Sequence, residues 1–87
     1  MNTAFLLMAQ YNGAAIIPLA DVCRDYFQHL SPEQFWRKFN EGHIDLPVTV
    51  MDPTSNKSAK GVALCHLADF LDAQIDKAKA ELKVIRS

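Results

Sequence analysis

The sequence predicts a single, mainly α-helical domain that carries a small β-hairpin. Three observations indicate this fold class. The chain has 87 residues, enough for one compact core. Four segments repeat apolar residues with helical spacing. Two short β-like segments flank a polar, turn-rich stretch at 52–60. With 49% hydrophobic and 22% charged residues, the composition is that of a folded domain rather than a disordered chain.

The first helix is expected over residues 3–11, with Thr3 as its cap and Asn12-Gly13 as its end. Its apolar side chains lie on nearly all faces of the helix. Such a helix must be buried on more than one side, either in its own core or against a partner. The next residues, 14–17, form a short strand-like run that Pro18 ends.

The second helix is expected to begin at Pro18, because the fixed φ of proline suits a first helical turn. Its apolar residues recur every three or four positions and predict one buried stripe, made of Leu19, Val22, Cys23, Tyr26 and Phe27. A tight connection at 29–30 then leads directly to the third helix.

The third helix, over 31–42, has the clearest start signal in the chain. Ser31 is a cap, a proline follows it, and Gln34 completes the S-x-x-Q capping box. Leu30 and Phe35 are placed to form a hydrophobic staple across this cap. Trp36 is expected to pack under the strands or in a subunit contact.

The rest of the chain predicts a strand, a loop, a return strand and a last helix. The strands are expected over 44–51, with Pro47 near the start, and over 61–64, with the polar loop at 52–60 between them. A fourth helix runs from about residue 66 to the C-terminus. Its apolar stripe consists of Leu67, Phe70, Leu71, Ile75, Ala78 and Leu82.

This order of elements is the plan of a winged helix-turn-helix of the excisionase and MerR type, with an added N-terminal helix. In that plan the helix at 31–42 enters the major groove of double-stranded DNA, and the loop at 52–60 lies along the flanking backbone as the wing. The candidate DNA-binding residues lie on these two segments: Ser31, Gln34, Arg37, Lys38, Glu41, Asn56, Lys57 and Lys60.

The residue types at these positions suit DNA. Arg37 and Lys38 offer donors to guanine edges or phosphates, and Gln34 can read adenine in bidentate fashion. The first backbone N–H groups of the helix can hold a phosphate. However, the formal net charge is -1, so the composition alone also allows these charges to form an ordinary solvated surface.

Other function classes find little support in the sequence. No pair among the possible metal ligands has the spacing of a zinc site; these ligands are His29, His43, His66, Cys23 and Cys65. No glycine-rich elbow surrounds Ser31, and no glycine-rich phosphate loop is present, so neither an enzyme nor a cofactor is expected.

The cysteines and the first residues predict the cellular compartment of the protein and whether it contacts a membrane. The two cysteines are expected to be free thiols packed as small hydrophobes, in a reducing cytoplasm. The apolar run at 4–9 is too short to span a bilayer, so no membrane contact is expected.

The terminal helices predict self-association. One 87-residue domain cannot easily bury both sides of residues 4–11. We therefore expect a homodimer or higher oligomer through one or both terminal helices. The alternative is that the first helix simply closes the monomer core. A symmetric dimer would match a palindromic site, and a head-to-tail arrangement would match tandem sites.

Several segments resemble the pyocin activator family. The resembling stretches are Asn2 to Tyr11, Ile16 to Leu19, Val22 to Phe27, Leu30 to Glu33, Arg37-Lys38, Gly42, Leu46-Pro47, Leu67 to Asp69 and Asp72 to Gln74. The resemblance implies a small transcriptional activator that binds DNA upstream of phage-tail-like bacteriocin genes, with related copies in prophages. A bound dimer of such an activator would recruit RNA polymerase as a further partner. Residues 34–36 and 52–59 match no family motif, and these positions would set sequence preference.

Two other functions remain open on the sequence alone. The first is an excisionase-like factor that uses the same contacts to bend DNA. The second is a protein-binding module that acts on a host protein and never touches DNA, which the slightly acidic balance and the apolar first helix favour.

Overall fold

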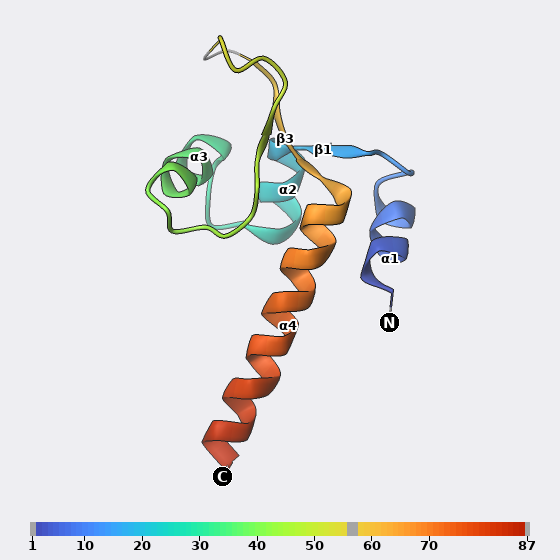
Figure 1. Ribbon diagram of the computed structural model, residues 1–87, viewed down its shortest axis with the longest axis vertical. Helices are drawn as coiled ribbons and strands as arrows, with labels where there is room; N and C mark the ends of the chain where they lie inside the picture. Colours follow the sequence, from blue (N-terminus) through green and yellow to red (C-terminus); the bar gives the residue numbers. More distant parts are fainter. Residues whose placement is uncertain (1, 56–57, 87) are drawn as a thin grey trace.

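The structure is a computed structural model that describes residues 2–55 and 58–86. In chain order its elements are α1 (Thr3–Gln10), β1 (Ile16–Pro18), α2 (Leu19–Tyr26), α3 (Pro32–Asn40), β2 (Thr49–Val50), β3 (Lys60–Ala63) and α4 (Leu64–Arg86). Figure 1 shows α4 leaving the folded body as a long rod, with the β2–β3 loop at the opposite end of the molecule. The predicted mainly helical class is confirmed.

The three strands form one antiparallel sheet with β3 in the centre. Ile17 of β1 pairs with Val62, and Thr49 of β2 pairs with Gly61. The predicted hairpin is therefore only part of the sheet, because the strand-like run before Pro18 adds a third strand. Gly61 lies where the backbones approach most closely: a Cβ there would come within 2.8 Å of the carbonyl oxygen of Ile17.

The segment before the loop is mostly irregular, so the strand predicted over 44–51 was too long. Only Thr49–Val50 pairs with β3. Leu46 is buried in the core and Pro47 has no N–H, so this stretch follows side-chain packing rather than a ladder of hydrogen bonds. β3 ends at Ala63, and α4 begins at Leu64, two residues earlier than expected.

The start of α1 also differs from the prediction. The cap is Asn2, whose Oδ1 accepts a hydrogen bond from the Phe5 N–H at 3.1 Å. Thr3 is the first helical residue, and its hydroxyl donates to Asp72 of α4. The predicted stop is confirmed, since Asn12 has a φ of 54° and the glycine after it a φ of 74°.

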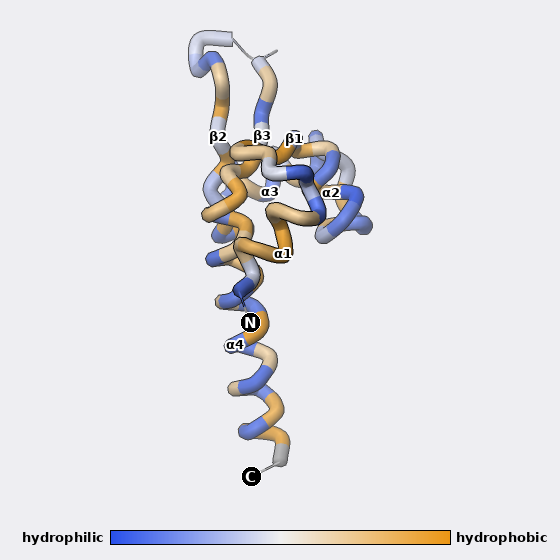
Figure 2. Tube along the Cα trace, turned by 90° about the vertical axis from the view of Figure 1, so that its right-hand side faces the viewer, coloured by the Kyte–Doolittle hydropathy of each residue, from blue (hydrophilic) through white to orange (hydrophobic). Residues whose placement is uncertain are grey.

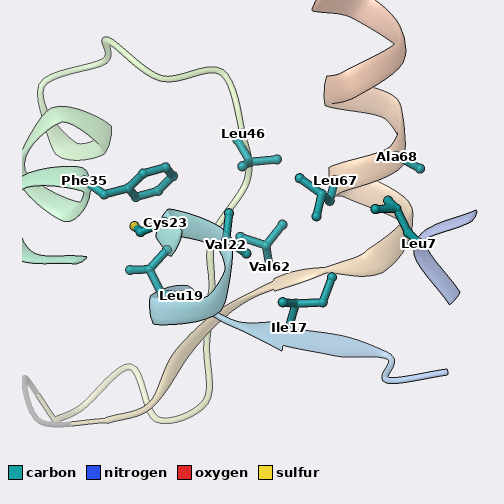
Figure 3. Close-up of a cluster of buried hydrophobic side chains, with 10 residues drawn as sticks. All are labelled: Leu7, Ile17, Leu19, Val22, Cys23, Phe35, Leu46, Val62, Leu67 and Ala68. Carbon is teal, nitrogen blue, oxygen red and sulfur yellow. The ribbon is translucent and has the colours of Figure 1, made fainter. Parts of the chain in front are cut away.

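The core lies between α2, α3, the sheet and the first turns of α4 (Figure 3). Its buried members are Leu7, Ile17, Leu19, Val22, Cys23, Phe35, Leu46, Val62, Leu67 and Ala68. The predicted stripe of α2 is confirmed, because Leu19, Val22 and Cys23 are all buried. Phe35 meets Phe27 edge to face, with ring centroids 4.9 Å apart.

The two cysteines are both free but differ in exposure. Cys23 is buried as expected, whereas Cys65 is exposed, so the prediction that both pack as small hydrophobes was wrong for Cys65. The reason is the early start of α4: Leu67 and Ala68 turn toward the core, which leaves residue 65 on another side of the helix.

Candidate nucleic-acid interface

The start of α3 is fixed by the predicted capping box, which the structure confirms. The Ser31 Oγ accepts from the Gln34 N–H at 3.2 Å, and the Gln34 Oε1 accepts from the Ser31 N–H at 2.9 Å. Two backbone donors at the helix start are thus satisfied by side chains. This arrangement sets the direction in which α3 leaves the turn after α2.

The inner face of α3 is anchored by Phe35, which is completely buried. The helix therefore turns its polar side outward, and Figure 1 shows it on the side of the body away from α1. The outward residues are all exposed: Glu33, Gln34, Arg37, Lys38 and Glu41. The helix ends as predicted, with Gly42 at a φ of 80° and the His43 N–H donating to the Lys38 carbonyl at 2.9 Å.

The structure brings most of the predicted α3 residues together. Gln34, Arg37, Lys38 and Glu41 line one depression of about 200 Å³, together with His29 and Leu30. The Oε2 of Glu41 also lies 3.6 Å from the Nε2 of His43. Four of the predicted DNA-facing residues of the helix therefore lie together on one surface, and Ser31 is not part of this lining.

The base of the β2–β3 loop is attached to α3. The Nζ of Lys60 lies 4.9 Å from the ring centroid of Trp36, which is within the range of a cation–π contact. Trp36 in turn stacks on Phe39, with centroids 5.4 Å apart and ring planes 17° apart. Trp36 is thus half-buried, and the side chain of Lys60 from β3 lies over its ring.

Between the loop, α3 and the start of α2 lies an open groove of about 750 Å³. Its walls are mainly apolar and are formed by Pro18, Leu19, Ala20, Pro32, Trp36, Val50, Pro53 and Ala59; its polar members are Glu33, Ser55, Ser58 and Lys60. The groove separates the loop from the first turn of α3. Both therefore flank a concave surface.

Asp52 organises the described part of the loop, a role that the sequence reasoning missed. Its Oδ1 accepts from the Thr54 N–H at 3.1 Å and from the Thr54 hydroxyl at 2.6 Å, and these bonds hold the pKa of its carboxyl below the usual range. Its own N–H donates to the Ser58 hydroxyl at 2.6 Å. The sequence Asp-Pro-Thr is the signal that indicates such a turn. The predicted Asn56 and Lys57 lie outside the described residues.

A second polar cluster joins α1 to α2. The Asp25 carboxylate accepts from the Tyr11 hydroxyl at 2.6 Å and from the Arg24 Nε at 2.9 Å. Arg24 first and Tyr11 second lower the pKa of Asp25 to about 2. Burial and the bond to Asp25 raise the pKa of Tyr11 above its ordinary value. The Tyr26 hydroxyl donates to the Gln10 Oε1 at 2.8 Å. These contacts hold the two helices together and leave the α3 face untouched.

Among residues 2–55 and 58–86, no three or more His, Cys, Asp or Glu side chains are grouped so that they could hold a metal ion. Within the same residues, no helix combines the length and the apolar character needed to cross a bilayer.

Fold and surface together define a small helical protein with a three-stranded sheet, which presents one capped polar helix beside a β loop. Residues 3–78 match the family of the pyocin activator protein PrtN, and the chain belongs to this family. The family is one of regulatory activators rather than of enzymes, which gives the chain a role in activating transcription. Comparison with the curated proteins and with the solved structures found no match.

Proposed function

We propose that the protein is a DNA-binding transcriptional activator of the winged helix-turn-helix type. In this proposal α3 lies in the major groove of double-stranded DNA, and the 52–60 loop lies along the flanking backbone. Family membership supports the activator role. The observation that supports the docking mode is the exposed face with Arg37 and Lys38, beside a loop whose Lys60 lies over Trp36.

The outward residues of α3 have distinct roles in this proposal. Arg37 forms two hydrogen bonds to a guanine edge, and Lys38 contacts a phosphate. The Gln34 Oε1 accepts the Ser31 N–H, but an amide oxygen has a second lone pair and the amide nitrogen still has its donors. Contact with adenine is therefore compatible with an intact cap. Ser31 and the first backbone N–H groups of α3 approach the phosphates of the DNA backbone.

The proposal extends to the setting of the protein. In this proposal the genes under its control are phage-tail-like bacteriocin or prophage genes, and membership of the pyocin activator family supports this setting. The bound protein acts in the cytoplasm and contacts RNA polymerase. Because the net charge is -1 and Glu33 and Glu41 lie beside the basic residues, few phosphates are neutralised, so non-specific affinity is modest.

The test compares two double variants with the same loss of positive charge. Arg37→Ala with Lys38→Ala removes the α3 cations, and Lys77→Ala with Lys83→Ala removes two exposed cations of α4. Binding to promoter fragments is measured by fluorescence anisotropy over a range of salt concentrations. Loss of the Arg37 contact costs about 1–3 kcal/mol, or about 5- to 150-fold in affinity. Loss of Lys38 lowers the salt slope by about 1.

The α4 variant is the control, and at the same oligomeric state, measured by light scattering, it is expected to bind nearly as the unchanged protein does. Both variants should keep their melting temperature, because all four side chains are exposed. Equal losses in the two variants would mean that general charge, rather than the α3 face, drives binding. Unchanged binding of the α3 variant would exclude α3 as the reading helix.

A further inference from the structure

The apolar stripe of α4 continues well past the folded body. Its members alternate in steps of four and three residues, the heptad spacing of a helix that packs against another helix: Leu64, Ala68, Leu71, Ile75, Ala78, Leu82 and Ile85. Ala68 is buried and Leu71 half-buried, but Ile75 is 51% exposed and Ile85 is 79% exposed. Figure 2 shows these hydrophobic bands along the free part of α4.

A groove between α1 and α4 begins where the buried part of this stripe ends. It measures about 840 Å³, and Leu6, Leu71 and Ile75 form its apolar walls. Asp72 and Asp76 lie along its α4 side. α1 adds further exposed apolar surface here, since Leu6 is half exposed. One side of the body therefore offers a groove with apolar walls, whose α4 side carries Asp72, Asp76 and Lys79.

The charges of α4 divide between its two halves. The aspartates Asp69, Asp72 and Asp76 all precede residue 77, and the lysines Lys77, Lys79 and Lys83 all follow residue 76, with Glu81 as the one acidic residue among them. A parallel pair of α4 helices would place acidic half beside acidic half. An antiparallel pair places each acidic half beside a basic half, which is favourable on both sides of a two-fold axis.

We propose that two copies of the protein associate through an antiparallel pair of α4 helices, in which the last turns of each α4 enter the α1–α4 groove of the other. Heptad registration then places the partner subunit's Leu82 opposite Leu71, and the partner subunit's Lys79 opposite Asp72. The second copy is the occupant because its own α4 supplies an apolar stripe for the apolar walls and several basic residues for Asp72 and Asp76, to which the groove's own lining adds Lys79. The inference goes beyond the proposed function, since it requires no DNA.

Oligomeric state without DNA tests the interface. Light scattering after gel filtration is expected to give twice the chain mass of 9.8 kDa. Leu82→Asp with Ile85→Asp should give the monomer mass. The matched control, Ala80→Asp with Val84→Asp, adds the same charge on the same exposed turns but off the stripe, and should remain a dimer. Helix content by circular dichroism checks that both variants fold.

A monomer mass for the unchanged protein at all concentrations would overturn the proposal. So would a control variant that dissociates as fully as the Leu82 and Ile85 variant. Persistent dimers in the stripe variant would mean that the copies meet elsewhere, which also contradicts it. None of these results depends on whether DNA binds.

The direction of the two helices has its own test. Cys65 is exposed near the start of α4, whereas Cys23 is buried, so a spin label reacts selectively at Cys65. With the proposed register, the two labelled residues lie about 35 Å apart along the helices. A parallel pair would bring them to about 10 Å, the spacing of two packed helices. A short distance from pulsed electron resonance would refute the antiparallel arrangement.

Discussion

Gln34 combines a structural role with a proposed DNA contact, and two substitutions separate these roles. Gln34→Ala removes the acceptor for the Ser31 N–H, while the Ser31 hydroxyl can still accept the backbone N–H of residue 34. Half of a capping box is worth about 0.5–1 kcal/mol. For a domain of this size the melting temperature should therefore fall by about 2–8 °C. Gln34→Glu keeps a side-chain acceptor at the same place, and a negative charge in the first turn favours the helix.

The thermal stability of Gln34→Glu should thus equal or exceed that of the unchanged protein. Its DNA binding should nevertheless fall by about 10- to 100-fold, because a carboxylate facing phosphates or base acceptors meets like charge at an interface. Circular dichroism melts and anisotropy titrations measure the two effects separately. If Gln34→Glu melts as early as Gln34→Ala, the capping argument is wrong. If Gln34→Glu binds DNA normally, α3 does not approach DNA at this residue.

Three further substitutions test the fold. Because the pKa of Asp25 is lowered to about 2, its carboxylate stabilises the fold fully above about pH 4, and this contribution is lost as the pH falls through about 2. Asp25→Asn should remove this acid dependence of the unfolding free energy, measured by urea titrations at several pH values. If the pH profile of the variant is unchanged, the cluster that joins α1 to α2 does not stabilise the fold. Phe35→Ala should lower the unfolding free energy by about 3–5 kcal/mol, and a loss under 1 kcal/mol would refute its place in the core. Gly61→Ala should broaden or shift the NMR signals of β1, since its Cβ would meet Ile17; an unperturbed β1 would refute the close approach.

Local signals predicted the middle of the chain well. The stripe of α2 and the capping box of Ser31 and Gln34 depend on residues within one or two helical turns, and both are present as expected. The stop at Asn12 is equally local, because only a few residue types adopt a positive φ readily. The cap at Asn2 was missed because Thr3 is an equally good capping residue by type, and only the backbone shows which one precedes the first turn.

Long-range pairing could not be predicted from these signals. β1 has three residues, and its partner β3 lies far along the chain, so no local pattern links Ile17 to Val62. The contact of Lys60 with Trp36 is of the same kind, since it depends on how the sheet places the loop base beside α3. The exposure of Arg37 and Lys38 was predictable, because helical periodicity alone places them on a different face of α3 from the buried Phe35.

The central claim, that α3 recognises double-stranded DNA, is tested most directly by in vitro selection. The purified protein selects duplexes from a random library, in parallel with the Arg37→Ala, Lys38→Ala variant. We expect the unchanged protein to enrich a defined motif and the variant to enrich none, because the base contacts are made from this face. If the unchanged protein enriches no motif even at low salt, it does not read DNA, and the exposed face of α3 serves a different partner.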